Sequence, residues 1–159
     1  MQARIRQAHL FAVVVAAALV VALGGTALAQ GNFGPGTWKL NLAKSKFDPG
    51  PAPKSETRVY KLWEKDGIKA TFTIVGADGK TFTREYAAHY DWKDYKYTSS
   101  PDFDTIALKL LDTNTLEATL KKGGKVVLTQ KVVLSGNGKV RTLTTIMGTN
   151  HDVVVYDRQ

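Results

Sequence analysis

The side chains that could do acid–base or metal chemistry are few and widely spaced in this sequence. Glu85 and His89 lie four residues apart, and His151 is followed directly by Asp152. Such residues can transfer protons or ligate a metal ion, but a metal site would need at least one more ligand. Two histidines without a spacing motif are typical of surface or hydrogen-bonded positions. The sequence therefore predicts no metal site and no cofactor.

A second group of candidates combines carboxylates with aromatic rings between positions 90 and 104. The aspartates are Asp91, Asp94, Asp102 and Asp104, and the aromatic residues are Tyr90, Trp92, Tyr95, Tyr97 and Phe103. Such groups can bind sugars, cleave glycosidic bonds or hold calcium. The alternation Asp-x-Asp-x-Asp-Gly of a calcium loop is missing, so a solvated loop is expected. The chain also has no cysteine and no Gly-x-Ser-x-Gly elbow, and we predict no catalytic residues.

Residues 1–29 have the three regions of a bacterial signal peptide. A positively charged start precedes an apolar run over residues 10–23, and Ala27 and Ala29 are the small residues of a signal-peptidase site. The apolar run is shorter than the roughly 20 residues that cross a bilayer core. We therefore expect cleavage between Ala29 and Gln30, a periplasmic or secreted protein, and no membrane span in the mature chain. A retained membrane anchor is the alternative.

The mature chain, residues 30–159, has the length of one domain with one apolar core. Without cysteines it cannot form disulfides, which favours a closed or well-covered sheet. The whole chain has 22 Lys and Arg against 14 Asp and Glu, but the basic residues are scattered along the predicted strands and turns. Nucleic-acid binding needs cations gathered on one face. We expect no nucleic-acid partner and a monomer.

Period-two alternation of apolar and polar residues recurs from Trp38 to the end of the chain. Residues 68–74 alternate Ile, Ala, Phe and Ile with Lys and Thr, which is typical of a strand with one buried face. Segments rich in Gly, Asn or Asp interrupt the alternation at 76–79, 112–114, 122–125, 135–138 and near 148–150. The fold class is therefore all-β, and we predict an antiparallel up-and-down β-barrel of about 8–10 strands.

Two segments lack this alternation and are expected as irregular loops. Residues 44–54 contain three prolines, so they can form neither the interior of a helix nor a central strand. We expect them as an ordered loop over one end of the barrel. The stretch from Tyr95 to Phe103 includes Ser99, Ser100 and Pro101 and is expected as the second irregular segment.

Both ends of the mature chain carry a family pattern. The first predicted strand opens with Gly36 and Trp38 in a Gly-x-Trp motif, and Arg158 stands at the end of the last strand. This resembles the calycin superfamily, the lipocalins and fatty-acid-binding proteins, and is similar to small exported bacterial lipocalin-like proteins. The resemblance implies that Gly36, Trp38 and Arg158 close the barrel, with the cation packed across the indole.

The resemblance and the aromatic residues together suggest a ligand site. Fatty-acid-binding proteins hold a carboxylate with an Arg-x-Tyr pair on the last strand; Tyr156 matches the tyrosine, and Val154 stands in the arginine position. Aromatic residues on the predicted strands can line an interior cavity. The candidate ligand-binding residues are Tyr60, Phe72, Tyr86, Tyr90 and Tyr156, and Trp63 is a further aromatic residue that could line the interior.

These observations favour an exported, non-catalytic barrel that binds a small apolar or amphipathic molecule. One alternative is a structural or interaction module of the cell envelope with a filled barrel. A hydrolase that uses Glu85, His89 or the loop aspartates is another. The sequence leaves these three functions open.

Overall fold

The computed structural model describes residues 32–48, 50–148 and 150–159. In chain order, the elements are β1 (Gly36–Leu40), the short 3-10 helix η1 (Leu42–Lys44), β2 (Ser55–Trp63), β3 (Gly67–Val75), β4 (Thr81–Ala88), β5 (Tyr95–Thr98), β6 (Thr105–Leu110), β7 (Thr115–Lys122), β8 (Lys125–Leu134), β9 (Val140–Met147) and β10 (Asn150–Arg158). The predicted signal peptide and its cleavage site lie outside the described residues. No helix within the described ranges is long and apolar enough to cross a membrane.

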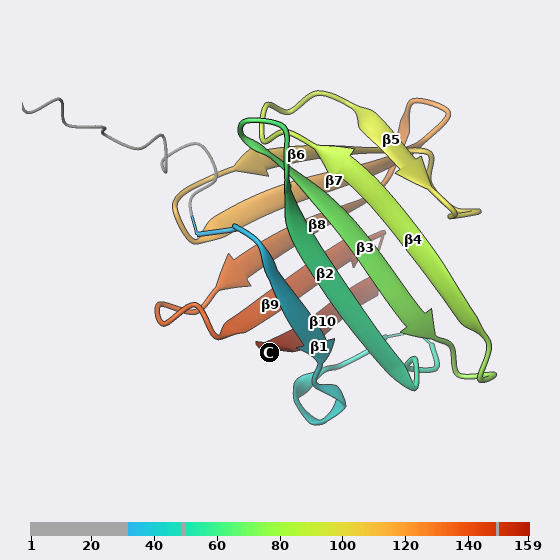
Figure 1. The fold of residues 1–159 in the computed structure, drawn as a ribbon. Helices are drawn as coiled ribbons and strands as arrows, with labels where there is room; N and C mark the ends of the chain where they lie inside the picture. Colours follow the sequence, from blue (N-terminus) through green and yellow to red (C-terminus); the bar gives the residue numbers. More distant parts are fainter. Residues whose placement is uncertain (1–31, 49, 149) are drawn as a thin grey trace, which may run out of the picture.

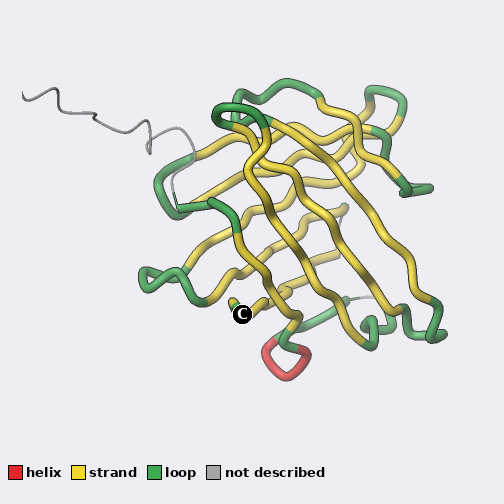
Figure 2. Tube along the Cα trace, in the orientation of Figure 1, coloured by secondary structure: helices red, strands yellow, loops and turns green. Residues whose placement is uncertain are grey.

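The ten strands form a closed barrel. Each strand pairs antiparallel with the next one along the chain, and β1 pairs with β10 through Trp38 opposite Arg158 and Leu40 opposite Tyr156. In Figure 1, β1 to β4 pass in front of β6 to β10 on opposite sides of the barrel, and η1 is the helical turn drawn in red in Figure 2. The predicted all-β up-and-down barrel is confirmed, at the upper end of the expected strand number.

Strand β3 shows how the sequence builds the barrel wall. Ile68, Ala70 and Phe72 are buried inside, whereas Lys69 and Thr73 are exposed. Successive side chains of a strand point to opposite faces, so this alternation gives one apolar face and one wet face. The same rule sends every second residue of the other strands toward a common interior.

Tight turns join the strands where the sequence predicts them. After β3, the backbone N–H of Gly76 donates to the Lys80 carbonyl at 2.9 Å, and Gly79 has a φ of 85°. Glycine adopts this left-handed conformation without steric cost. The predicted turns at 112–114, 122–125 and 135–138 also connect consecutive strands.

The prediction of an irregular stretch from Tyr95 to Phe103 is wrong in its first half. Residues Tyr95–Thr98 form β5, in which Tyr97 is buried and lies opposite Tyr86 of β4. Ser99, Ser100 and Pro101 follow the end of this strand. Ser99 has a φ of 62° and turns the chain out of the sheet. The other predicted loop, 44–54, does connect β1 to β2.

The two ends of the barrel differ. At one end the segment before β1 crosses the barrel, because the backbone N–H of Asn32 donates to the carbonyl of Thr113 in the β6–β7 turn at 2.9 Å. This segment places Phe33 inside with only 2% of its surface exposed, and the Tyr90 hydroxyl donates to the Phe33 carbonyl at 2.9 Å. The loops β1–β2, β5–β6 and β9–β10 lie at the opposite end. Phe33 therefore seals one end of the barrel.

Candidate functional site

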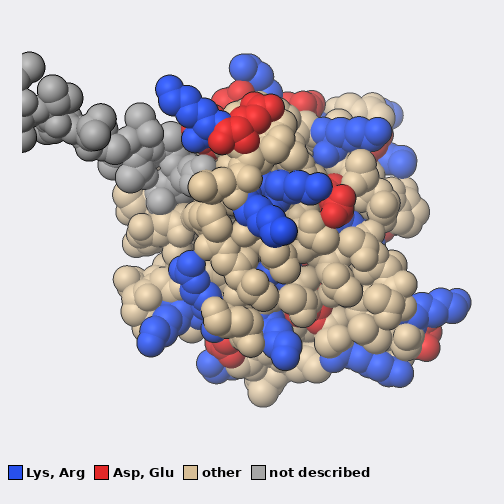
Figure 3. Space-filling view, in the orientation of Figure 1, with Lys and Arg blue, Asp and Glu red and all other residues tan. Residues whose placement is uncertain are grey.

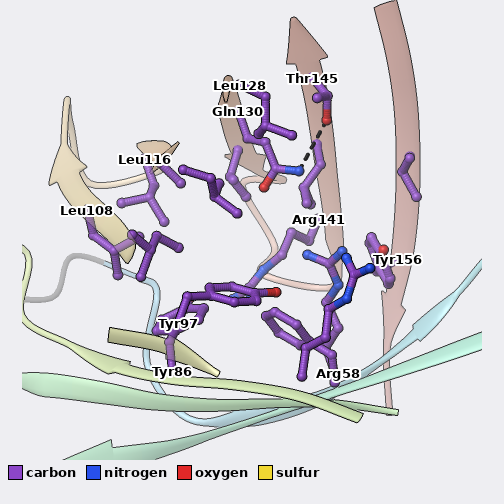
Figure 4. Close-up of a pocket in the computed structure, with 18 of the residues that line it drawn as sticks. Arg58, Tyr86, Tyr97, Leu108, Leu116, Leu128, Gln130, Arg141, Thr145 and Tyr156 are labelled. Atoms are coloured by element: carbon purple, nitrogen blue, oxygen red, sulfur yellow. Dashed lines mark hydrogen bonds between the residues drawn. The ribbon is translucent and has the colours of Figure 1, made fainter. Parts of the chain in front are cut away.

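The barrel contains a cavity of about 260 Å³. Figure 4 shows leucines such as Leu108, Leu116 and Leu128 on one side of this space, with arginine and tyrosine side chains across from them. Phe47 and Phe103 line it at the loop end. The cavity suits one small molecule with both apolar and polar parts.

A buried ion pair occupies the wall near β2. Arg58 Nε donates to Glu56 Oε1 at 2.6 Å, and the Tyr156 hydroxyl donates to Glu56 Oε2 at 2.9 Å. The Arg58 guanidinium also lies 4.6 Å from the ring centre of Phe72 and 4.3 Å from that of Tyr156. Burial lowers the pKa of Arg58, but Glu56 and the neighbouring tyrosines raise it further, to well above its ordinary value. The charge of Arg58 is thus balanced within the barrel.

Arg141 is a second buried cation in the cavity, and no carboxylate of the described residues pairs with it. Arg141 is 3% exposed, and its Nε has no hydrogen-bond partner among the described residues. Its guanidinium carbon lies 4.2 Å from the ring centre of Tyr60, 4.4 Å from that of Trp38 and 5.6 Å from that of Phe33. These rings offset part of the cost of burying the charge. They supply no acceptor, so an anionic group in the cavity would complete the site.

Arg84 is the third arginine that lines the cavity. Its guanidinium lies 3.6 Å from Asp102 and faces the rings of Phe82 and Phe103. Gln130 adds a neutral polar group, donating to Thr145 at 3.2 Å (Figure 4). The cavity thus has more arginines than carboxylates on its wall, and its electrostatic character favours an anionic ligand.

All five predicted ligand-binding residues line this cavity: Tyr60, Phe72, Tyr86, Tyr90 and Tyr156. Tyr97, which was not predicted, lines it too, and burial raises its pKa to about 12 although Arg58 and Arg84 act in the opposite direction. Burial also raises the pKa of Tyr86, Tyr90 and Tyr156. These phenols are neutral at physiological pH and can donate hydrogen bonds. Their role in binding stays a prediction.

Four charged residues of the cavity were missed in the sequence. They are Glu56, Arg58, Arg84 and Arg141. The available signal was strand parity: Glu56 and Arg58 precede Tyr60 by four and two residues, so all three point to the same face of β2. By the same rule, Arg84 shares the face of Tyr86. Each of these charged residues lies beside a residue that was predicted to face the interior of the barrel.

Gly36, Trp38 and Arg158 lie together at the end of the barrel that Phe33 seals. The guanidinium carbon of Arg158 is 5.6 Å from the Trp38 ring centre, and Arg158 Nη2 donates to the Pro35 carbonyl at 2.9 Å. A Cβ on Gly36 would lie 3.2 Å from Arg158 Nη2, so glycine leaves room for this side chain. The indole therefore contacts two cations, of which Arg141 is the closer.

The candidate acid–base residues do not converge. Glu85 accepts a hydrogen bond from the Thr71 hydroxyl at 2.9 Å, whereas His89 lies 3.0 Å from Glu64 and 2.6 Å from Asp66. Although Glu85 and His89 have the same strand parity, each binds its own neighbours. A hydrolase built on this pair has no support in the geometry.

The other polar candidates are also separate. His151 is exposed, and Asp152 lines the cavity mouth and accepts from the backbone N–H of Asp48 at 2.7 Å. The loop aspartates have different partners: Asp91 with Lys93 and Tyr95, Asp94 with Lys121, Asp102 with Arg84, and Asp104 with the backbone of Gly123. Within residues 32–48, 50–148 and 150–159, no group of three or more His, Asp and Glu side chains could hold a metal ion.

Trp63 does not line the cavity, so the expectation that it does is wrong. It lies three residues after Tyr60 on β2 and therefore points to the opposite face. Its ring packs against His89, with ring centres 4.8 Å apart, and against Tyr95, at 6.1 Å.

The charges on the exterior are dispersed. On the face seen in Figure 3, lysines and arginines are scattered among acidic and uncharged residues.

The fold and the cavity define a class: a closed, ten-stranded antiparallel up-and-down barrel with an interior space. Solved structures of the fluorescent protein UnaG have this fold. A variant with one asparagine replaced by alanine aligns with a TM-score of 0.58 and 18% identity, covering 80% of this chain and 96% of that one. The wild-type protein aligns with a TM-score of 0.55 and 17% identity, covering 78% and 96%. No protein-family model and no curated protein matches the sequence.

Proposed function

We propose that this chain is an exported, non-catalytic carrier that binds a small amphipathic molecule, with an anionic group of the ligand held at Arg141. The observation that carries the proposal is the burial of this guanidinium beside a cavity, without an acceptor among the described residues. An isolated buried charge is costly unless a partner neutralises it. A ligand carboxylate or similar oxyanion would supply that partner and form charge-assisted hydrogen bonds.

The rest of the cavity supports an amphipathic ligand over a purely polar one. The leucines of β6 to β8 provide an apolar wall for a hydrocarbon or ring system. Its volume of about 260 Å³ limits the ligand to a small molecule. An interaction module with a filled barrel is less well supported, because a filled interior would leave no space of this size.

Export and the likeness to small bacterial lipocalin-like proteins are part of the same proposal. Their support is the N-terminal pattern of basic residues, apolar run and Ala27-Leu28-Ala29, together with Gly36, Trp38 and Arg158. Cleavage before Gln30 would leave Phe33 in the mature chain, and Phe33 is the residue that seals the barrel. A periplasmic or secreted carrier would meet its ligand in the cell envelope or outside the cell.

Calorimetric titration with dodecanoate and with dodecanol tests the proposal, because the two probes share a chain and differ in charge. We expect wild type to bind dodecanoate more tightly, and Arg141→Met to lose that preference by about 10- to 100-fold, which corresponds to the typical strength of a hydrogen bond to a charged group. Lys131→Met removes an exposed cation on β8 and is the matched control. Equal binding of dodecanoate by wild type and Arg141→Met, or no binding of either probe by wild type, would overturn the proposal.

A further inference from the structure

Arg84 presents a second incomplete cation site on the cavity wall. Its Nε is buried and has no hydrogen-bond partner among the residues that the structure describes. The guanidinium carbon lies 5.2 Å from the ring centre of Phe82 and 5.9 Å from that of Phe103. Its side chain is 22% exposed, which places Arg84 between the interior and the solvent.

The partner of Arg84 is weakly held. Arg84 Nη2 lies 3.6 Å from Asp102 Oδ2, which is too far for a hydrogen bond. The Asp102 side chain is 58% exposed, and ion pairs that are open to water contribute little to stability. Asp102 therefore neutralises part of the charge of Arg84 without occupying its donors.

The guanidinium groups of Arg84 and Arg141 face opposite ends of the barrel. Arg84 is the fourth of the eight residues of β4, and its guanidinium faces Asp102 and Phe103 of the β5–β6 loop at the mouth. Arg141 is the second residue of β9, just after the β8–β9 turn, and its guanidinium lies over the ring of Phe33 at the sealed end. In an up-and-down barrel, odd-numbered and even-numbered hairpin turns lie at opposite ends. One anionic group therefore cannot satisfy both arginines, and Arg58 is already paired with Glu56.

We propose that the ligand carries two separated anionic groups, one bound at Arg141 near the sealed end and the other at Arg84 near the mouth. The apolar middle of the molecule lies against the leucine wall between them. The second group displaces Asp102 from Arg84 and supplies the hydrogen-bond acceptors that Asp102 does not. This inference rests on the proposed function, because it adds a second anchor to the same cavity.

The test compares monoacids with diacids of equal chain length: decanoate, dodecanoate and tetradecanoate, each with its α,ω-dioate. For the chain length that fits best, we expect wild type to bind the diacid at least 10-fold more tightly than the monoacid. Arg84→Gln should reduce this ratio of affinities toward one. Asp102→Asn should raise the ratio several-fold, because it removes the competing carboxylate.

Asp78→Asn is the matched control for Asp102→Asn. It removes a carboxylate from the β3–β4 turn at the same end, where Asp78 pairs with Lys80, and it should leave the ratio unchanged. An equal rise in both variants would mean a general charge effect and would overturn the inference. A wild-type ratio near one at every chain length would overturn it too, while tight monoacid binding would leave the proposed function standing. If the circular dichroism spectrum shows that Arg84→Gln does not fold, the ratio of diacid to monoacid affinity in Asp102→Asn alone decides whether the inference holds.

Discussion

Replacing Glu56 with Gln should weaken the fold and strengthen anion binding at the same time. The substitution keeps the size of the side chain but removes the charge that balances Arg58. Arg58 and Glu56 are only 13% and 9% exposed, so breaking the pair leaves a buried cation, which typically costs about 3–5 kcal/mol. The amide oxygen can still accept from Arg58 Nε, so we expect the lower end, about 3 kcal/mol.

Urea unfolding followed by tryptophan fluorescence measures this loss. With an m value of about 2 kcal/mol per molar, the midpoint should fall by about 1.5 M. Glu85→Gln is the matched control, because Glu85 faces outward and its ion pair with Lys69, at 4.0 Å, is open to solvent. Exposed pairs contribute about 0–1 kcal/mol, so its midpoint should change little.

Simple damage to the core would lower both stability and affinity, whereas loss of the Glu56 charge should lower stability and raise the affinity for an anion. In Glu56→Gln, Arg58 becomes a further cation in the cavity without a balancing carboxylate, and dodecanoate should bind about 10-fold more tightly than to wild type. Dodecanoate at about 100 times its dissociation constant should restore about 2.7 kcal/mol of stability. A Glu56→Gln barrel as stable as Glu85→Gln, or one that binds dodecanoate no better than wild type, would refute the charge balance between Glu56 and Arg58.

Three further predictions concern other parts of the molecule. Burial raises the pKa of Tyr97 from 10.0 to about 12. Because the unfolded chain loses the phenol proton at a lower pH than the folded chain, the free energy of unfolding should fall as the pH rises from about 10 to 12. Thermal melts across this range should show the decline, and Tyr97→Phe should make it smaller. Phe33→Ala should destabilise the barrel by about 3–5 kcal/mol in urea unfolding, because Phe33 is fully buried; a shift below about 1 kcal/mol would show that Phe33 does not seal the end. The mass of the exported protein should correspond to a chain that begins at Gln30, and a mass that includes residues 1–29 would contradict the predicted cleavage.

The strands and turns could be predicted because local chemistry determines them. Residues 68–74 carry the alternation of a half-buried strand, and Gly79 supplies a left-handed φ in the turn after it. Strand β5 was missed because four residues are too short to show a period, and the nearby Ser99 and Pro101 suggested a loop. What makes Tyr95–Thr98 a strand is pairing with β4 and β6, which no local pattern reveals.

The aromatic part of the cavity could be predicted, but its charged part could not. Tyr60 and Tyr86 were recognised because aromatic residues favour the inside of a sheet. Arg58 and Arg84 share the faces of these tyrosines, yet a single charged residue on a strand is usually exposed. Only the assembled barrel shows that Glu56 neutralises Arg58 and that no residue in the described part of the chain does the same for Arg141.

One row of side chains across the barrel shows how arginines on nearby strands, among them Arg58 and Arg84 of the cavity, are kept apart. Following the register from β10 through β1, β2 and β3 to β4, Arg158 is opposite Trp38, Trp38 opposite Arg58, Arg58 opposite Phe72, and Phe72 opposite Arg84. Like charges directly opposite each other destabilise a sheet, and here an aromatic ring separates each arginine from the next. The rings also attract the cations, as the 4.6 Å between Arg58 and Phe72 illustrates. These five residues are distant in the sequence, so the alternation exists only once the barrel closes, and replacing either ring would expose the two arginines beside it to each other.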